Sequence, residues 1–253
     1  PAEKNQWHFK DSELVGTPVE KGDFLYTVRH YKEALEYYTS AIRQTGKTKL
    51  DPMDIEHALE RKLFIYVRSL RDRVGAVQSL SEDLKSPQLT QAMQKEVKGW
   101  IDTLNKIPVQ KSPKYKAGEL ETLASTTLQP FLKGARRFEP TALVNFLYIS
   151  GLIYQFIDSE EEKTVTPGLL YWLAVSDMQL NKSMYFSMSD DFFKECIRRF
   201  PESPTAQKCF TELENHMVEA YTGSDGTSLP ADVKQELKGL KNLLNAEKAS
   251  KKN

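Results

Sequence analysis

Prolines mark the starts of several stretches in which apolar residues recur with helical spacing. These five residues are Pro52, Pro87, Pro140, Pro167 and Pro204. Proline is tolerated in the first turn of a helix, where its missing N–H would have no helical partner, but it disrupts a helix interior. Alternating β-branched runs are rare, and we find no Asn-Gly or Asp-Gly hairpin between apolar segments. The chain is therefore predicted to be all-α.

The periodicity predicts eleven helices, with ends placed to within about two to four residues. The predicted spans are 18–28, 31–45, 54–70, 72–85, 88–107, 115–133, 140–157, 167–180, 186–200, 203–222 and 230–247. Short connections favour antiparallel packing of neighbouring helices. Because so many helices in series cannot share one centre, we expect antiparallel hairpins stacked in a row.

The predicted organisation has two helical halves separated by a candidate hinge. The N-terminal helical-repeat half is expected at 18–107 and the C-terminal half at 117–222. Residues 108–116 are the candidate hinge, since they carry two prolines and three lysines. We expect 1–17 to be poorly packed, and 223–253 to form a terminal capping helix followed by a disordered tail.

Composition excludes several classes of protein. Lysine plus arginine equals aspartate plus glutamate, at 35 each, so the chain lacks the positive charge typical of a nucleic-acid binder. The longest uncharged run, 140–157, is near the lower limit of membrane-spanning length and contains Asn145, Ser150 and Gln155. We therefore expect a buried central helix there, and at most peripheral association with a membrane.

Three segments carry parts of the tetratricopeptide pattern, which reads Trp-x2-Leu-Gly-x2-Tyr on a first helix and Ala-x3-Phe on a second. They are Ala34-x3-Tyr38 with Ala41, Leu147-x2-Ser150-Gly151-x2-Tyr154, and Leu170-x2-Leu173-Ala174 followed by Ser189-x3-Phe193 and Pro201. The chain resembles the divergent tetratricopeptide repeats of bacterial envelope proteins, where a junction like RRFPESPTAQKC links two units. The resemblance implies a stacked superhelix with a concave groove. The spacing between the last two matches is shorter than a regular repeat, so 140–157 is alternatively the second helix of the preceding hairpin.

Cys196 and Cys209 are the only two cysteines, and they stand at similar distances before and after the turn predicted near Phe200–Ser203. In an antiparallel hairpin these positions face each other, so we predict a disulfide and an oxidising compartment. The alternative is a pair of buried reduced thiols. Because the sequence begins with Pro1, we expect a leader or other preceding residues to have been removed. We predict a periplasmic or secreted protein, with a cytoplasmic location as the alternative.

Motifs for catalysis, metal binding or cofactor binding are not found. The four histidines are scattered, and there is no CxxCH, glycine-rich phosphate loop or Gly-x-Ser-x-Gly elbow. The acidic run 158–162 is interpreted as a solvated loop, and Asp190-Asp191 as the acidic start of a helix. We therefore predict a non-enzymatic chain without catalytic residues, metal or cofactor.

The aromatic residues in and after 140–157 are more numerous than a core requires. We predict that Tyr148, Tyr171 and Trp172 contribute to a partner-binding surface, together with the polar side chains of Asn145 and Gln155. The predicted function is an adaptor that binds a protein or peptide in a concave groove and does not bind nucleic acid. The alternatives are a structural subunit of an envelope assembly and an accessory domain of a cell-wall-acting enzyme.

Overall fold

The computed structural model describes residues 9–44, 50–108, 115–132, 139–159, 165–180, 187–224 and 226–250. Over these residues the chain is all-α, as predicted, with eleven α-helices and one two-stranded ribbon. The chain folds into two compact units, Pro1–Val109 and Gln110–Asn253. Each unit is described by itself.

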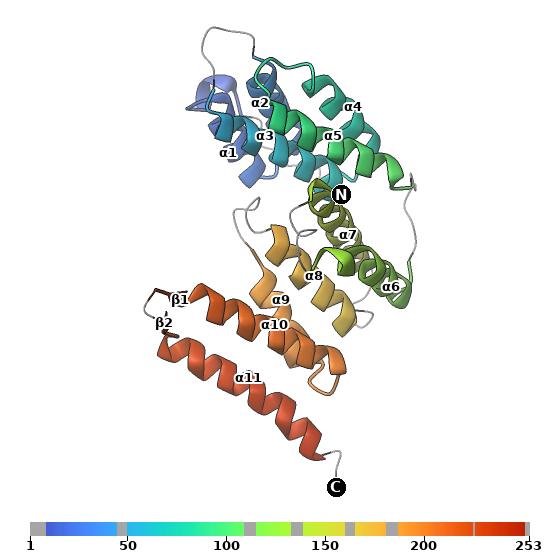
Figure 1. Ribbon diagram of the computed structural model, residues 1–253, viewed down its shortest axis with the longest axis vertical. Coiled ribbons are helices and arrows are strands. Elements are labelled where there is room, and N and C mark those ends of the chain that lie inside the picture. Colours follow the sequence, from blue (N-terminus) through green and yellow to red (C-terminus); the bar gives the residue numbers. More distant parts are fainter. Residues whose placement is uncertain are drawn as a thin grey trace. The chain divides into compact units, whose positions relative to one another are not determined.

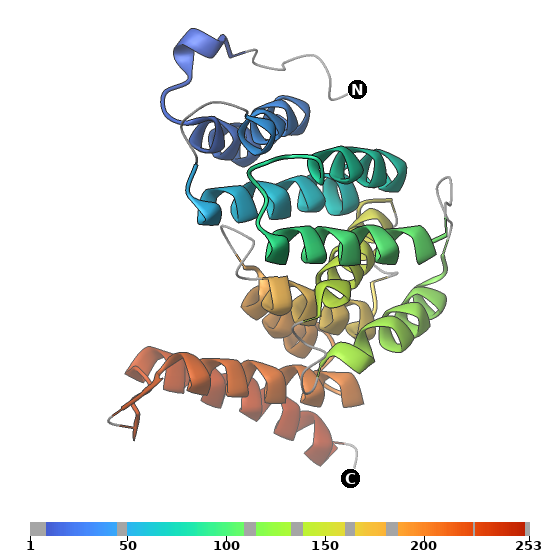
Figure 2. The same ribbon diagram turned by 45° about the horizontal axis from the view of Figure 1, so that its top comes forward.

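The first unit contains five α-helices, a short 3-10 turn at Asp11–Glu13 and a π-helical turn at Ile65–Ser69. The helices are α1 (Pro18–Thr27), α2 (Tyr31–Arg43), α3 (Pro52–Phe64), α4 (Arg73–Asp83) and α5 (Gln91–Lys106). Successive helices α1–α2, α2–α3 and α4–α5 pack against each other, and α4 also contacts α2 and α3 (Figure 2). Helices are therefore packed mainly on their neighbours in the sequence.

Side-chain caps mark where α1 and α3 start. Thr17 and Glu20 form a capping box, in which Thr17 Oγ1 accepts from the Glu20 N–H at 3.2 Å and Glu20 Oε2 accepts from the Thr17 N–H at 2.7 Å. Asp51 accepts from the Met53 N–H at 2.8 Å, just before Pro52 in the first turn of α3. These helix starts are thus determined by residues close in sequence and do not depend on long-range packing.

Pro87 is the one predicted helix-start proline that does not begin a helix. It lies in a turn, and α5 starts four residues later with Thr90 as its cap. The Ser86 hydroxyl instead donates to the Ile42 carbonyl and accepts from the Gln88 N–H at 3.1 Å. These bonds hold the turn against the end of α2 and satisfy backbone groups that a helix would otherwise pair.

The helix predicted at 54–70 is continuous in extent but changes its geometry. After α3, residues Ile65–Ser69 form a π-helical turn that ends with the Leu70 N–H donating to the Ile65 carbonyl at 2.8 Å. Arg71 follows with a φ of 55°, a left-handed conformation that terminates the helix. Hydrophobic periodicity does not distinguish this wider turn from a regular α-helical one.

The second unit contains six α-helices. They are α6 (Ala117–Leu128, continued by a 3-10 turn at Gln129–Phe131), α7 (Pro140–Ser159), α8 (Pro167–Leu180), α9 (Ser189–Arg199), α10 (Pro204–Ala220) and α11 (Ala231–Ser250). Each helix packs on its sequence neighbour, and contacts also join α6 to α8, α8 to α10 and α9 to α11 (Figure 1). Alternate helices therefore lie next to each other along the unit.

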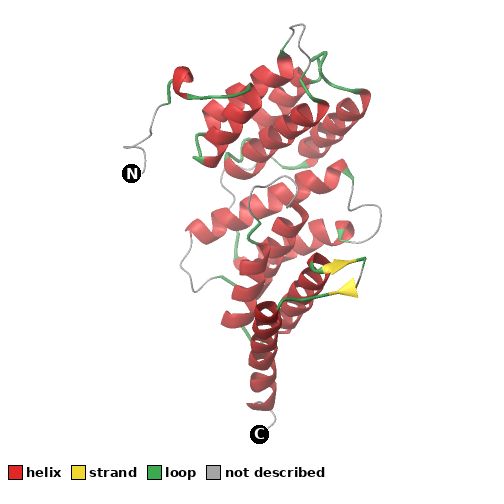
Figure 3. Cartoon of the chain, turned by 90° about the vertical axis from the view of Figure 1, so that its left-hand side faces the viewer, coloured by secondary structure: helices red, strands yellow, loops and turns green. Residues whose placement is uncertain are grey.

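A small ribbon between α10 and α11 was not predicted. Strands β1 (Thr222–Gly223) and β2 (Gly226–Thr227) pair antiparallel, with Thr222 opposite Thr227 (yellow in Figure 3). The sequence does contain an Asp-Gly pair at 225–226, but its flanks are polar rather than apolar. Gly226 has a φ of 100°, which only glycine adopts readily.

The N-terminal end of the described chain makes packing contacts, and the C-terminal end is helical. The Phe9 ring lies edge-on to the Phe24 ring, with centroids 5.1 Å apart, and Leu14 is buried. Helix α11 continues to Ser250, so most of the expected disordered tail is helical. Residues 1–8 and 251–253 lie outside the described residues, as does most of the candidate hinge 108–116.

Helix α7 contains the long apolar run. By length and composition it could cross a membrane, with a mean hydropathy of 1.3 over its most apolar stretch, but 56% of that stretch is buried inside the structure. It packs against α6 and α8. This packing favours its interpretation as a core helix. Only 158 and 159 of the acidic run 158–162 are described, and they form the end of α7.

Candidate functional site

A groove of about 830 Å³ lies on the face formed by α6, α8 and α10. Because α8 packs on both α6 and α10, these alternate helices present one continuous surface. The lining residues are Glu121, Thr122, Ser125, Thr126, Gln129, Leu132, Gly168, Tyr171, Trp172, Val175, Met178, Gln179, Thr205, Gln207, Lys208, Thr211 and Glu212. The size lies within the range of about 300–1,000 Å³ typical of ligand sites.

Two of the predicted binding residues contribute the aromatic part of the groove. Tyr171 and Trp172 on α8 lie edge to face, with ring centroids 5.1 Å apart. Tyr171 is half-buried, and Trp172 is 6% exposed. Val175 and Met178 extend this apolar stripe along α8, because residues three or four apart share one face of a helix.

The walls of the groove carry hydroxyl groups that already donate their protons. Thr122 Oγ1 donates to the Gly118 carbonyl at 2.8 Å, and Thr126 Oγ1 donates to the Thr122 carbonyl at 2.9 Å. On the opposite wall, Thr211 Oγ1 donates to the Gln207 carbonyl at 3.0 Å. A hydroxyl that donates to its own helix keeps its lone pairs as acceptors. These three threonines therefore offer acceptors to the groove.

Glu121 is held at the start of α8. Its carboxylate accepts a hydrogen bond from the Thr166 hydroxyl. It also occupies the space that a Cβ at Gly168 would need. A negative charge beside the first turn of a helix is stabilised by the helix dipole. This carboxylate thus has a structural role at one edge of the groove.

Glu212 on α10 is the second carboxylate of the groove. Burial raises the pKa of the Tyr171 phenol to about 12, and the neighbouring Glu212 charge adds to the shift. Glu212 is half-buried. Within the described part of the chain no hydrogen bond or ion pair is formed by its carboxylate, and Lys208, one turn earlier, does not pair with it.

The other three predicted residues lie on α7 and do not line this groove. Burial, together with nearby Tyr115, raises the pKa of Tyr148 to about 12. Asn145 Nδ2 donates to the Thr141 carbonyl at 2.9 Å within the same helix, and Gln155 is half-buried. The reason is the alternation of helices: α7 is not part of the face that α6, α8 and α10 share. Their proposed role in binding stays a prediction.

Sequence reasoning missed the contributions of α6 and α10. The signal was a set of small hydroxyl residues on one helix face, with Thr122, Ser125 and Thr126 on α6 and Thr211 on α10. Residues at these spacings lie on one side of a helix. Without the pairing of α6 and α10 on either side of α8, that pattern could not be distinguished from an ordinary solvated face.

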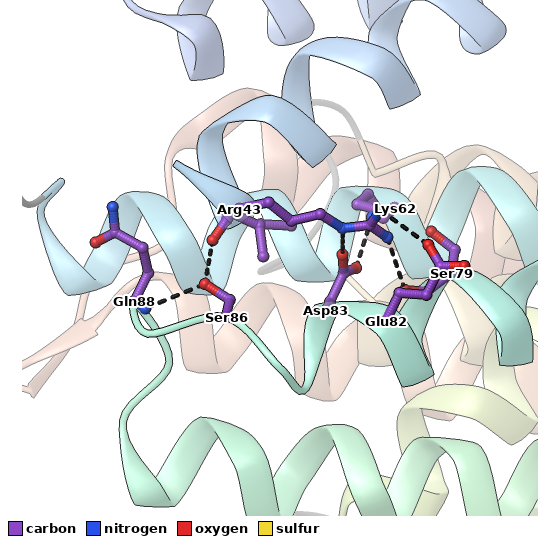
Figure 4. Close-up of polar contacts among 8 residues, drawn as sticks. Arg43, Lys62, Ser79, Glu82, Asp83, Ser86 and Gln88 are labelled. Carbon is purple, nitrogen blue, oxygen red and sulfur yellow. Dashed lines mark hydrogen bonds and ion pairs between the residues drawn. The ribbon is translucent and has the colours of Figure 1, made fainter. Parts of the chain in front are cut away.

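A buried charge cluster joins three helices of the first unit (Figure 4). Asp83 lies on α4 and forms two ion pairs. Its Oδ2 atom is 2.5 Å from Nζ of Lys62, which lies on α3, and its Oδ1 atom is 2.7 Å from Nε of Arg43, which lies on α2. Lys62 and Asp83 are both fully buried. Burial lowers the pKa of the Lys62 ammonium, and the Asp83 charge opposes that shift. Because this cluster has no exposed lysine or aspartate surface, its role is to connect α2, α3 and α4.

Asp23 links a tyrosine and a histidine in the first unit. Tyr38 Oη donates to Asp23 Oδ1 at 2.6 Å, and His57 Nε2 lies 2.8 Å from the same oxygen. A histidine beside a carboxylate can serve acid–base chemistry, but that chemistry needs a nucleophile or substrate position close by. Among the described residues no serine or cysteine is bonded to His57. We interpret the trio as a connection among α1, α2 and α3.

Candidate metal ligands do not cluster in the part of the chain that the structure describes. It contains no group of three or more His, Cys, Asp and Glu side chains that could hold a metal ion. Asp190 and Asp191 lie in the first turn of α9, where their charge complements the helix dipole as predicted.

The predicted cysteine pair is confirmed at the level of geometry. Cys196 on α9 and Cys209 on α10 are fully buried, their sulfur atoms are at disulfide distance, and their Cα atoms are 6.5 Å apart. The bond ties α10, one wall of the groove, to α9.

Neither a protein-family model nor a curated protein nor a solved structure matches this chain.

Proposed function

We propose that this chain is a non-enzymatic, tetratricopeptide-like adaptor that binds an extended segment of a partner protein in the α6–α8–α10 groove. The observation that carries the proposal is the composition of that groove. Its aromatic stripe comes from Tyr171 and Trp172, and most of the polar side chains that line it are neutral hydroxyls and amides.

An extended peptide is the ligand that suits such a surface. Its backbone N–H and C=O groups are not paired within the segment, so they need partners from the protein. The threonine oxygens can accept from peptide N–H groups, and the side-chain amides of Gln129 and Gln179 can both donate and accept. The aromatic rings supply contact area, as they do in binding hot spots.

Packing in α1 and α2 supports the tetratricopeptide-like part of the proposal. Ala34, Tyr38 and Ala41 are fully buried in α2. Gly22 in α1 faces the Tyr38 ring so closely that a Cβ there would be 2.7 Å from a ring carbon. This close packing of a small residue on an aromatic ring supports the tetratricopeptide-like assignment.

The cysteine pair supports a location where disulfides persist. Such bonds are retained in the periplasm and outside the cell, and they are rare in the reducing cytosol. We therefore propose the bacterial periplasm or cell envelope as the site of action.

Groove-filling substitutions test the proposed function. Peptides selected by the protein from a random-sequence library displayed on phage would be synthesised, and their affinity measured by fluorescence anisotropy. Thr126→Trp and Thr211→Trp place a bulky ring in the groove from exposed wall positions, and Asn215→Trp is an exposed control on α10.

The two groove variants are expected to lose about tenfold or more in affinity, because the peptide must vacate the filled space. The Asn215→Trp control is expected to bind like the parent protein. Undiminished binding by both groove variants, or the failure of the library to yield any binding peptide, would contradict the proposal.

A further inference from the structure

Glu212 is a groove carboxylate that forms no ion pair with the described residues. It is half-buried on α10 and lines the groove beside Tyr171. Lys208 is exposed on the same helix and makes no ion pair with it. A half-buried carboxylate is stabilised by a cation or by hydrogen-bond donors placed beside it. Within the described part of the chain, the Glu212 carboxylate is thus available to a cation that enters the groove.

The second carboxylate does not change that balance. Glu121 is already bonded to the Thr166 hydroxyl at the N-terminal end of α8. Among the described residues that line the groove, Lys208 is basic and Glu121 and Glu212 are acidic, so these three charged side chains sum to one net negative charge. The groove is thus electrostatically complementary to a basic group.

Tyr171 adds a second feature that favours a cation. Its aromatic ring lines the groove next to Glu212, and a cation over a ring face is attracted when it lies within about 6 Å of the ring centroid. The same chain already uses such contacts, since the Arg61 guanidinium lies 4.7 Å from the centre of the Tyr26 ring. Carboxylate and ring together form a site for a planar or compact cation.

The threonine walls extend the match. Thr126 and Thr211 keep acceptor lone pairs because their protons go to their own helices. An arginine side chain presents five N–H donors and no acceptor. It can therefore pair with these oxygens better than a neutral amide or a carboxylate can.

We propose that the groove selects an extended segment with a basic side chain, arginine above all, whose cation is held by the Glu212 carboxylate and the Tyr171 ring. This specificity rests on the proposed function, since it names the chemistry of the segment that the groove binds. Acidic segments are disfavoured because they would place a like charge beside Glu212.

The test uses the full chain and the displayed random-sequence peptide library. Selections are run in parallel on the parent protein, on Glu212→Gln, which keeps the shape and removes the charge, and on Glu219→Gln. Glu219 is an exposed glutamate on α10 that does not line the groove. The parent protein and Glu219→Gln are expected to enrich Arg or Lys at one peptide position, and Glu212→Gln is expected to lose that enrichment.

A second measurement varies the peptide as well as the protein. A selected basic peptide and its Arg→Gln or Lys→Gln counterpart are compared on the parent protein. The expected loss is about tenfold or more, and it should shrink as salt is added. On Glu212→Gln the two peptides should bind with nearly equal affinity. Tyr171→Leu should weaken the basic peptide more than its neutral counterpart, whereas Tyr171→Phe should retain the difference.

Two results separate this inference from the function on which it rests. Peptides without a basic preference that are still displaced by Thr126→Trp would overturn the basic specificity and leave the groove as the binding site. Basic peptides whose binding is unchanged in Thr126→Trp and Thr211→Trp would overturn both proposals.

Discussion

At the scale of single residues, the Lys62–Asp83 ion pair is fully buried in the first unit. Removing two charges from water is costly, and the attraction between them compensates only when the geometry is good and the remaining polar atoms are bonded. Here both carboxylate oxygens of Asp83 are paired, one with Lys62 and the other with Arg43. Arg43 in turn donates to the Ser79 carbonyl at 3.1 Å. The pair is therefore tolerated because all of its members are bonded together.

Asp83→Leu is expected to lower the free energy of unfolding by about 3–5 kcal/mol, because it leaves the Lys62 ammonium buried without a counter-ion. Adding Lys62→Met to that variant should recover part of the loss by removing the orphaned charge. Glu82→Gln is the control: its ion pair with Arg43 is exposed and should contribute less than about 1 kcal/mol. Urea unfolding measures all three, and a loss in Asp83→Leu no larger than in Glu82→Gln would contradict the prediction.

Three tyrosines should titrate late. Burial raises the pKa values of Tyr26, Tyr148 and Tyr171 to about 12, from an ordinary value of 10.0. Since the unfolded chain releases these protons first, their contribution to stability is complete below about pH 10 and is lost as the pH rises toward 12. Ultraviolet titration of the folded protein should show late phenolates, and Tyr171→Phe should remove one of them. Titration of every phenol near pH 10 would exclude this.

At the scale of helices, the contact between α1 and α2 depends on a glycine. A Cβ at Gly22 would lie 2.7–3.0 Å from three atoms of the Tyr38 ring. That ring is fully buried, and its hydroxyl is bonded to Asp23, so it has little freedom to move. The sequence of α1 therefore sets how closely α2 can approach.

Gly22→Ala is expected to destabilise the protein by about 1–3 kcal/mol through overpacking, even though alanine is the better helix former. Gly239→Ala in α11 is the matched control, since a Cβ there meets no atom within 4 Å. It should stabilise the protein by about 0.5–1 kcal/mol. Thermal unfolding followed by circular dichroism compares the two, and equal shifts of the same sign would contradict the predicted role of Gly22.

The α9–α10 hairpin should depend on its disulfide. The cysteines are 13 residues apart, a loop for which the chain-entropy model gives about 3 kcal/mol of stabilisation. Reductant should therefore lower the urea midpoint of the parent protein and leave a Cys196→Ser, Cys209→Ser variant unaffected. Intact mass after alkylation of protein from its native compartment checks the bond directly. Two alkylated thiols there would remove the support for an oxidising location.

The helices were predictable because their signals are local. Caps such as Thr17–Glu20, together with first-turn prolines such as Pro167 and Pro204, act within a few residues, and observed starts agree with prediction to within a few positions. The cysteine pairing was predictable for a similar reason, because it spans one hairpin. The prediction that a helix starts at Pro87 was wrong. Ser86 is hydrogen-bonded to Ile42, 44 residues earlier, and a local pattern contains no information about that contact.

The groove was predicted only in part. Tyr171 and Trp172 were found from their aromatic character, which marks binding surfaces in general. Asn145, Tyr148 and Gln155 were grouped with them because they are close in sequence, but they lie on α7, which does not contribute to the face of α8 that forms the groove. Glu212 was missed because its position depends on the packing of α10 against α8. Which helices share a face is a tertiary property.

At the scale of the whole molecule, the chain divides into two compact units at residues 109 and 110. Each unit has its own buried core, with Tyr38 and Trp100 in the first and Phe146 and Phe193 in the second. Domains with separate cores can fold independently.

Fragments 1–109 and 110–253 are therefore each expected to be helical and to unfold cooperatively when expressed alone. Circular dichroism and thermal unfolding measure this. Fragment 110–253 should also retain the proposed peptide binding in a binding assay. A fragment that lacks a cooperative transition would show that its core needs the other unit.

The packing of each helix on its near neighbours has a kinetic consequence. Interactions between residues close in sequence give a low relative contact order, and small helical proteins of that kind fold in microseconds to milliseconds. Little loop-closure entropy has to be lost before the first hairpin gains stabilising interactions. During synthesis, α1 and α2 can pair before the later helices exist, and each following helix can add to a surface already formed. Each new helix of a unit therefore finds part of its packing surface on helices that have already been made.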